Sequence, residues 1–233
     1  MNCFAKLFAM KNFVILSAII FLFFSCKYAD TMATPVGNVF YFTKPQPIND
    51  SELNSFPNKF KGIYMNSDSV ILKISNEMMY NEFEYKYRFH KNQKDSLLNY
   101  FDMIDGKYIS KHDNGVYTSK IIGDSIEFTN IDIDTLFKFS DSQKAKRING
   151  NLVLNQKDSI FWTVKMLTLS KNKLTIKQLF SDDDLKRLDS ITKIHSKIID
   201  STSFILAPKR SEFLKFFKLK NLGYDSEFIK ISN

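Results

Sequence analysis

The feature that most constrains the fold is a strict alternation of aromatic and charged side chains at residues 83–90. The run reads Phe-Glu-Tyr-Lys-Tyr-Arg-Phe-His, so an aromatic ring recurs at every second position. A strand turns successive side chains to opposite faces, whereas a helix would scatter these rings around its circumference. We therefore predict a half-buried β-strand whose aromatic face lies toward a core.

Similar patterns predict strands through most of the chain. The expected strands are 63–65, 70–75, 107–110, 116–122, 126–129, 135–140, 151–154, 160–169 and 174–180. Asp-Ser pairs precede three of the apolar runs, and such side chains close turns by bonding to nearby backbone amides. Residues 171–173 fit the tip of a hairpin. The fold class we expect is mainly β, an antiparallel β-meander forming a barrel or a sandwich.

The last third of the sequence predicts short C-terminal α-helices. Three aspartates at 182–184 precede apolar residues at helical spacing, and acids in a first turn interact favourably with the helix dipole. A second helix is expected at 212–218, with Phe213, Phe216 and Phe217 on one side. Strands are expected at 203–206 and 228–231. We expect the helices to pack across an opening or an edge of the sheet.

The N-terminus has the pattern of a secretory signal. Lys6 and Lys11 precede an uncharged run at 13–24, which is shorter than the roughly 20 residues that a membrane-spanning helix needs. Ser25 is the small residue before the expected cut, and the sequence Leu-Phe-Phe-Ser-Cys at 22–26 resembles a lipobox. We therefore predict lipidation of Cys26. The alternative is a short anchor or a buried helix with an ordinary thiol, and Met10 is an alternative start to Met1.

The cysteine count supports lipidation. Cys3 and Cys26 are the two cysteines of the chain, so only Cys26 would remain after cleavage, and no internal disulfide could form. A leftover cysteine in an exported protein needs an explanation, and a lipid on it provides one. The partner expected here is a membrane. We predict a lipid-anchored protein of the cell envelope, in the outer membrane facing the periplasm, because Lys27 stands where an inner-membrane retention signal has aspartate.

Proline placement suggests the domain boundaries. Four of the five prolines fall at positions 35, 45, 47 and 57, and proline fixes the backbone and lacks an amide donor. We expect a signal peptide at 1–25, a lipidated tether at 26–57 with one strand at 39–42, and a single β-rich domain with C-terminal helices at 58–233.

Charge and glycine content exclude several functions. The net charge is +8, and the basic residues are interspersed with many acidic ones. The basic stretches at 144–147 and 209–220 are interpreted as solvated faces. No nucleic-acid partner is expected in the envelope. Seven glycines form no Gly-rich phosphate loop, so no cofactor is predicted.

No metal site is predicted. His90, His112 and His195 are far apart and lack ligand spacing. Asn130 and Asp132 begin an alternation that superficially suggests a calcium loop, but the glycine and glutamate of such a loop are absent at its sixth and twelfth positions. We interpret this run, which ends at Asp134, as a strand edge entering a turn.

No catalytic residue is predicted either. The chain has no nucleophile elbow, and Ser170 and Lys173 have the bare S-x-x-K spacing without its companion motifs. Carboxylate pairs cannot be selected among 25 acids. Trp162, the single tryptophan, lies inside a predicted strand and is assigned to the core.

Three segments carry a resemblance. They are Asp-Thr-Leu-Phe-Lys-Phe-Ser at 134–140, Gly-Asn-Leu-Val-Leu-Asn at 150–155 and Trp-Thr-Val-Lys-Met-Leu-Thr-Leu at 162–169, continued by 174–176 and the helix at 182–188. With the lipobox, this pattern resembles a family of uncharacterised lipoproteins common in Bacteroidota-type bacteria. The resemblance implies a compact, loosely lipocalin-like β-meander domain, and it brings no activity or ligand.

Three functions remain open from the sequence. The first is a non-enzymatic envelope module that binds a protein partner or an apolar ligand, since catalytic motifs are absent and the 23 Phe and 10 Tyr exceed what a core requires. The second is a hydrolase whose site is assembled from distant acidic or histidine residues. The third is a structural subunit of an envelope assembly.

Overall fold

The computed structural model describes residues 37–191, 197–216 and 218–232. The expected signal peptide at 1–25, the lipidation site Cys26 and the first part of the tether lie outside these residues. His195 and Phe217 lie outside them as well.

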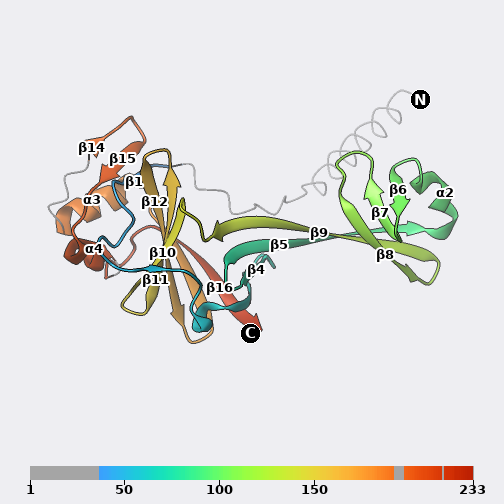
Figure 1. Cartoon of the computed structure of the whole chain (residues 1–233), viewed down its shortest axis with the longest axis horizontal. Helices are drawn as coiled ribbons and strands as arrows, with labels where there is room; N and C mark the ends of the chain where they lie inside the picture. The colour runs from blue at the N-terminus through green and yellow to red at the C-terminus, as the bar shows by residue number, and fades with distance from the viewer. Residues whose placement is uncertain (1–36, 192–196, 217, 233) are drawn as a thin grey trace, which may run out of the picture. The chain divides into compact units, whose positions relative to one another are not determined.

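The described chain is mainly antiparallel β, as the sequence predicts (Figure 1). The strands are β1 (Val39–Phe42), β2 (Glu52–Leu53), β3 (Gly62–Met65), β4 (Ile71–Ile74), β5 (Met78–His90), β6 (Phe101–Ile104), β7 (Lys107–Ser110), β8 (Val116–Ile122), β9 (Ser125–Lys138), β10 (Gln143–Ile148), β11 (Asn151–Asp158), β12 (Phe161–Ser170), β13 (Lys173–Gln178), β14 (Lys197–Ile198), β15 (Ser203–Leu206) and β16 (Tyr224–Ser232). The helices are α2 (Lys94–Leu97), α3 (Asp182–Ile191) and α4 (Arg210–Phe216), with 3-10 turns η1 (Asn58–Phe60) and η2 (Lys91–Gln93).

Most neighbouring strands in the sheet are neighbours in sequence. The main path runs β14-β15-β1-β12-β13-β16-β3-β4-β5-β9-β8-β7-β6, and β10 and β11 branch from β12. Successive hairpins β10 to β13 form a meander, and the β12–β13 turn lies at the predicted hairpin tip. The path has two ends, β14 and β6, so the described strands form an open sheet.

The strand predictions are confirmed, except that two segments predicted as separate strands form one continuous strand. Strands β7, β8 and β15 have the predicted bounds, whereas the segments predicted at 126–129 and 135–140 are parts of one strand, β9. Asn130, Asp132 and Asp134 therefore lie in the middle of β9, and their expected position before a turn is wrong. Extended backbone paired to β5 on one side cannot form a calcium loop, because such a loop must wrap around the ion.

Residues 37–57 belong to the same compact unit as the rest of the described chain. Strand β1, which the sequence predicts, pairs in parallel with β15, and Phe42 is almost completely buried. Phe56 packs edge-on against Phe137 with ring centroids 5.6 Å apart. Apolar residues flank the prolines, so burial of these rings holds the segment on the sheet.

Side chains from β10 and β11 also bind the proline-rich segment. Asn155 accepts a hydrogen bond from the backbone N–H of Gln46 at 2.6 Å and donates to the carbonyl of Gln46 at 2.9 Å. The Lys146 ammonium donates to the carbonyls of Pro45 and Pro47 at 3.2 and 3.0 Å. Lys146 is only 5% exposed, and burial lowers its pKa. The interpretation of 144–147 as a solvated face is therefore wrong at this residue.

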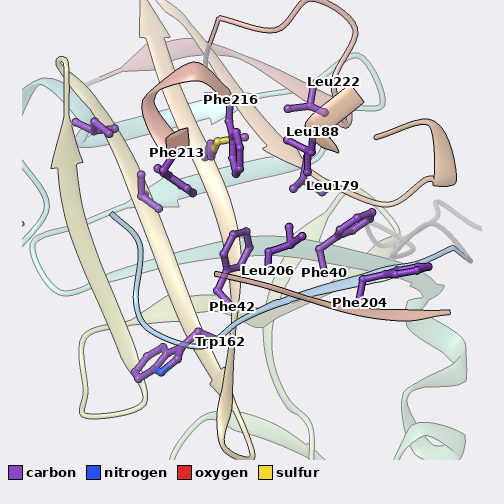
Figure 2. Packing of buried hydrophobic residues seen from close by; sticks show 13 residues of the cluster. Phe40, Phe42, Trp162, Leu179, Leu188, Phe204, Leu206, Phe213, Phe216 and Leu222 are labelled. Atoms are coloured by element: carbon purple, nitrogen blue, oxygen red, sulfur yellow. The ribbon is translucent and has the colours of Figure 1, made fainter. Parts of the chain in front are cut away.

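The larger core lies between the sheet and the C-terminal helices (Figure 2). Phe213 and Phe216 of α4 pack with each other at 5.2 Å, and Phe213 meets Phe42 of β1 edge-on at 6.1 Å. Leu188 of α3 and Trp162 of β12 belong to the same cluster. The predicted core position of Trp162 is confirmed, and the C-terminal helices pack against strand residues in this cluster.

A second core involves β5 and β9. These strands pair along their length, from Met78 opposite Lys138 to His90 opposite Ser125. Strand β4 flanks this ribbon at Met79–Glu82, and β8 flanks it at Ser125–Thr129 of β9. Leu97, Tyr108, Ile126 and Phe128 are buried around the β8 end of the ribbon. The small core therefore sits where α2 and β6–β8 meet the ribbon.

The aromatic face of β5 is covered unevenly. Phe83 and Phe89 are partly buried, but Tyr85 and Tyr87 are 43% and 48% exposed. The strand is as predicted, whereas the expectation that its aromatic face packs into a core holds only toward its two ends. No helix in the described part of the chain is long and apolar enough to cross a bilayer.

Candidate functional site

A cavity of about 700 Å³ opens beside the small core. Its walls come from β5, the segment η2–α2, β6, the end of β7 and β8. Five aromatic residues line it: Tyr87, Phe89, Tyr100, Phe101 and Tyr117. The volume lies within the range of roughly 300–1,000 Å³ that is typical of small-ligand sites. This is the candidate functional site, and we call it the aromatic cavity.

The aromatic wall is held by ring packing behind it. Phe101 stacks on the buried Phe128 at 5.5 Å with an interplanar angle of 18°, and it meets Tyr117 edge-on at 5.3 Å. Phe128 also contacts Tyr108 at 4.7 Å and Phe89 at 5.6 Å, both edge-on. Offset and edge-to-face pairs of this kind each add about 0.5–1.5 kcal/mol beyond burial. Phe89 and Phe101 are thus held in place by a buried partner, Phe128.

Polar side chains complete the lining of the aromatic cavity. They are Gln93, Ser96, Asn99, Ser110, Lys111 and His112. The Lys111 ammonium donates to the carbonyl of Leu98 at 2.8 Å and lies 3.3 Å from Asp102, so the charge of this lysine is already partnered. A mainly apolar wall with a few polar groups is the usual composition of a small-ligand pocket.

The loop between β7 and β8 is held by its own side chains. The backbone N–H of His112 donates to Ser110 Oγ at 3.3 Å, and the N–H of Gly115 donates to Asp113 Oδ1 at 3.0 Å. Hydrogen bonds from the Ser110 hydroxyl and the Gly115 amide hold the pKa of Asp113 below its usual value. Asp113 is therefore a carboxylate at neutral pH.

A second cavity of about 570 Å³ lies next to the aromatic cavity. Tyr87 and Tyr117 line both cavities. Three tyrosines and two aspartates give the second cavity its chemistry: Tyr85, Tyr87, Tyr117, Asp113 and Asp132. We call it the tyrosine–aspartate cavity.

The strand pairing explains where the second cavity forms. The ladder between β8 and β9 begins at Thr118–Thr129, so β9 continues past Asn130 without β8 beside it. The Asn130 amide donates to the Val116 carbonyl at 2.9 Å and closes the end of this ladder. The loop carrying Asp113 and residues 130–132 of β9 line the same cavity. A hollow remains between that loop and the free edge of the ribbon.

The two cavities do not hold a recognisable nucleophile and base. The Ser110 hydroxyl interacts with Asp113 and with a backbone amide, and both contacts are those of a turn rather than of a serine–histidine pair. His90 is exposed, and its ring forms a hydrogen bond with the Asn92 side chain at 2.8 Å. Within the described ranges no group of three or more His, Cys, Asp or Glu side chains is placed to hold a metal ion.

The aspartates at 182–184 have a structural role at Asp184. Its carboxylate accepts the backbone N–H groups of Phe180 and Ser181, each at 3.0 Å, and that of Gly223 at 2.6 Å. The N–H of Asp184 in turn donates to the Ser181 hydroxyl at 3.1 Å. This reciprocal pair caps α3 and anchors the loop before β16, as the N-terminal capping box does in other helices.

Sequence reasoning missed the residues that form both cavities. The tyrosines of β5 were visible as an alternating run, but η2, α2 and β6 had no periodic signal, so Tyr100 and Phe101 were not placed. The structure, unlike the sequence, shows that exposed apolar residues gather in this part of the chain. Large hydrophobic side chains that are more than a third exposed include Tyr85, Leu98, Tyr100, Met103, Ile104, Val116 and Ile131.

The comparisons with known proteins add no relative from which a role could be transferred. What the site binds must therefore be inferred from the residues that line it. No family model matches the chain, and no curated protein and no solved structure matches it either.

Proposed function

We propose that this protein is a non-enzymatic binding module that takes an apolar, ring-bearing ligand into the aromatic cavity. The observation that carries the proposal is a volume of about 700 Å³ walled by five aromatic side chains. Tyr100 is 67% exposed and Tyr87 is 48% exposed, so about half or more of each residue's surface is open at the cavity. Covering them with an apolar ligand would release about 25 cal/mol per Å² of buried area.

A neutral fluorescent probe tests the proposal. N-phenyl-1-naphthylamine gains fluorescence in apolar surroundings, so we expect saturable enhancement with the full-length protein. Replacement Tyr100→Ala removes a mostly exposed ring of the cavity and is expected to weaken binding about fivefold to tenfold. Tyr224→Ala is the matched control, because Tyr224 is 52% exposed on β16 and lines neither cavity. Equal affinity of both variants and the wild type would count against the aromatic cavity as the site.

The same proposal places the module at a membrane through lipid on Cys26, in the envelope and most simply in the outer membrane facing the periplasm. Its support is the signal-like N-terminus and the single cysteine that remains after cleavage at residue 25. We expect Cys26→Ala to move the protein out of the membrane fraction and to abolish incorporation of radiolabelled palmitate. Labelled palmitate in the alanine variant would refute the anchor.

One observation favours hydrolysis as the second candidate. Asp113 and Asp132 line the same cavity, and glycoside hydrolases use two carboxyl groups. One of the pair must act as an acid with a raised pKa, whereas hydrogen bonds lower the pKa of Asp113. We therefore expect no release of p-nitrophenol from a panel of p-nitrophenyl glycosides, and turnover that is lost in Asp132→Asn would establish the hydrolase instead.

The third candidate, a structural subunit, is favoured by the edge strand β6. Met103 and Ile104 of β6 are 59% and 53% exposed, and β6 pairs only with β7 among the described strands. Exposed apolar edges are typical of surfaces that meet other chains. Repeated recovery of one partner from membranes, lost in Met103→Lys but kept in Tyr100→Ala, would favour this role over ligand binding.

A further inference from the structure

The tyrosine–aspartate cavity has a composition that the aromatic cavity lacks. Its aromatic rings, Tyr85, Tyr87 and Tyr117, share the space with the carboxylates of Asp113 and Asp132. The faces of aromatic rings carry negative electrostatic potential, and a carboxylate carries a full negative charge. Both kinds of group attract a cation, so they act in the same direction.

Strand register places these groups on one face of the β5–β9 ribbon. Residues directly opposite one another in a sheet share a face, and Tyr85 pairs with Asn130 while Tyr87 pairs with Phe128. The next pair along the same face is Phe83 with Asp132. The rings of Phe83 and Tyr85 therefore lie opposite the polar side chains of Asp132 and Asn130, and the ring of Tyr87 lies opposite the ring of Phe128.

Charges on the opposite face of the ribbon are already neutralised. There Lys86 lies 2.7 Å from Glu84, Arg88 lies 2.6 Å from Glu127, and Lys73 lies 2.6 Å from Glu82. Asp132 belongs to the other face. Its Oδ1 accepts only the backbone N–H of Ile133, at 2.9 Å, among the hydrogen bonds of the described residues.

In the described part of the chain, neither cavity aspartate takes part in an ion pair. No side-chain nitrogen of a described lysine, arginine or histidine lies within 4.0 Å of the carboxylate oxygens of Asp113 or Asp132. His112 acts on Asp113 electrostatically, but its side chain lines the aromatic cavity. Both carboxylates keep oxygen lone pairs for a ligand, since each oxygen can accept more than one hydrogen bond.

Gly115 allows the ring and the carboxylate to approach each other. A β-carbon at this position would lie 3.1 Å from Asp113 Oδ1 and 3.2 Å from the Tyr117 ring. The carboxylate and the ring therefore flank the same small space beside the loop backbone. A cation that reaches the Asp113 carboxylate there also lies near the Tyr117 ring.

We propose that the tyrosine–aspartate cavity recognises an organic cation, an ammonium or guanidinium group carried by the ligand whose apolar part occupies the aromatic cavity. This inference rests on the proposed function, because the two cavities share Tyr87 and Tyr117 and one ligand can reach both. Carboxylates supply charge and hydrogen-bond acceptors, and the tyrosine rings supply cation–π attraction. The source of the cation is a small amine or a lysine or arginine side chain of a partner.

A pair of isosteric probes isolates the charge. We expect 4-phenylbutylamine, an ammonium at pH 7, to bind the full-length protein about tenfold more tightly than neutral 4-phenylbutan-1-ol, with both affinities measured by calorimetry. Asp132→Asn and Asp113→Asn should each reduce this preference about threefold or more while leaving the affinity for the alcohol unchanged. Asparagine at 113 can still accept the Gly115 amide, so the loop is kept.

Asp124→Asn is the matched control. Asp124 is an exposed aspartate in the turn between β8 and β9, it lines neither cavity, and its loss changes the net charge by the same amount. Its amine preference should equal that of the wild type. Loss of the preference in Asp124→Asn would mean that long-range charge is responsible, and it would overturn the cation site.

The remaining outcomes separate this inference from the proposed function. If the alcohol binds but the amine gains nothing, the cation site is refuted and the aromatic cavity stands. If no apolar probe binds, the proposed function fails, and the cation site is then tested with tetramethylammonium alone. Tetramethylammonium binding that is weakened by Asp132→Asn supports the cation site, and absence of tetramethylammonium binding refutes it. The dipeptides acetyl-Phe-Lys-amide and acetyl-Phe-Gln-amide identify the source, because tighter, Asp132-dependent binding of the lysine peptide indicates a protein partner.

Discussion

Tyr87 of β5 and Tyr117 of β8 stand with their ring centroids 6.1 Å apart and their planes inclined by 54°, and both rings line both cavities. Burial raises the pKa of Tyr117, and the charges of Asp113 and Tyr87 add to this rise. The Tyr117 phenol is therefore neutral throughout the physiological range and can donate a hydrogen bond to a ligand. The pair forms a shared wall, so one substitution should affect both sites.

Tyr87→Ala is expected to weaken the binding of both the neutral naphthylamine probe and the ammonium probe, because the Tyr87 ring borders both cavities. Tyr85→Ala should weaken the binding of the ammonium probe alone, since Tyr85 lines the tyrosine–aspartate cavity and not the aromatic cavity. The two tyrosines are matched in exposure, at 48% and 43%, so both replacements should leave folding intact. Fluorescence and calorimetric titrations check the pattern, and equal effects of the two variants on the naphthylamine probe would contradict it.

Asp184→Ala should lower the free energy of unfolding by about 2–4 kcal/mol, because three backbone N–H groups lose their acceptor at a buried helix start. Asp183→Ala is the control. The Asp183 side chain is 77% exposed and meets only Lys186, so its loss should change stability by less than about 0.5 kcal/mol. Urea unfolding followed by the fluorescence of Trp162 measures both. Similar costs for the two aspartates would show that the capping box contributes little.

The stability of the protein should fall between pH 10 and about 12 through Tyr64. Burial raises the pKa of this phenol from 10.0 to about 12, and its hydroxyl donates to the Phe60 carbonyl at 2.7 Å. Above pH 10 the unfolded chain loses the Tyr64 proton while the folded chain keeps it, so the unfolded state is favoured as pH rises. The contribution is complete below pH 10 and is lost by about pH 12.

Replacement Tyr64→Phe removes this titration and should flatten the dependence of the unfolding free energy on pH in that interval. Tyr100→Phe removes an exposed phenol and should keep the slope of the wild type. Denaturant titrations at several alkaline pH values check the difference. A slope that Tyr64→Phe does not alter would assign the alkaline loss to other groups.

Phe128→Ala should abolish binding of the naphthylamine probe while the emission of Trp162 stays unchanged. Phe128 is fully buried behind the aromatic cavity and supports Phe89 and Phe101 by ring packing, whereas Trp162 lies in the larger core. Removing a buried phenylalanine costs about 3–5 kcal/mol, enough to open a small core locally. Phe213→Ala is the converse variant, with changed Trp162 emission as its expected result. A changed tryptophan spectrum in Phe128→Ala would show that the two cores unfold together.

Much of the strand pattern was predictable because it is local. The alternation at 83–90 requires extended backbone whatever surrounds it, and the apolar runs of β7, β8 and β15 are short enough for their bounds to follow from flanking turn residues. The helix starting at Asp182 was predictable for the same reason, since its acidic first turn and apolar spacing lie within ten residues. Cys26 and its lipidation are also local predictions, and they concern residues outside the described structure.

Other features depended on partners that are distant in the sequence. Residues 39–42 join the core because β15, more than 160 positions later, pairs with them in parallel. Lys146 can be buried because the carbonyls of Pro45 and Pro47 accept hydrogen bonds from its ammonium group, and nothing in the neighbouring sequence indicates this. A lysine in a basic run is normally solvated, so composition alone predicts the opposite.

The alternating aromatic run shows both local and long-range control within a single strand. Its sequence determined that Phe83, Tyr85, Tyr87 and Phe89 share one face, because the side-chain period of a strand is two. Only the tertiary structure decided which of them are covered. The small core packs against Phe89, whereas Tyr85, whose partner on β9 is Asn130, lies beyond the end of the β8–β9 ladder and is 43% exposed. Tyr87 is 48% exposed. Burial depends on where neighbouring strands stop, and the ends of those strands are set by pairing between segments that no local pattern connects.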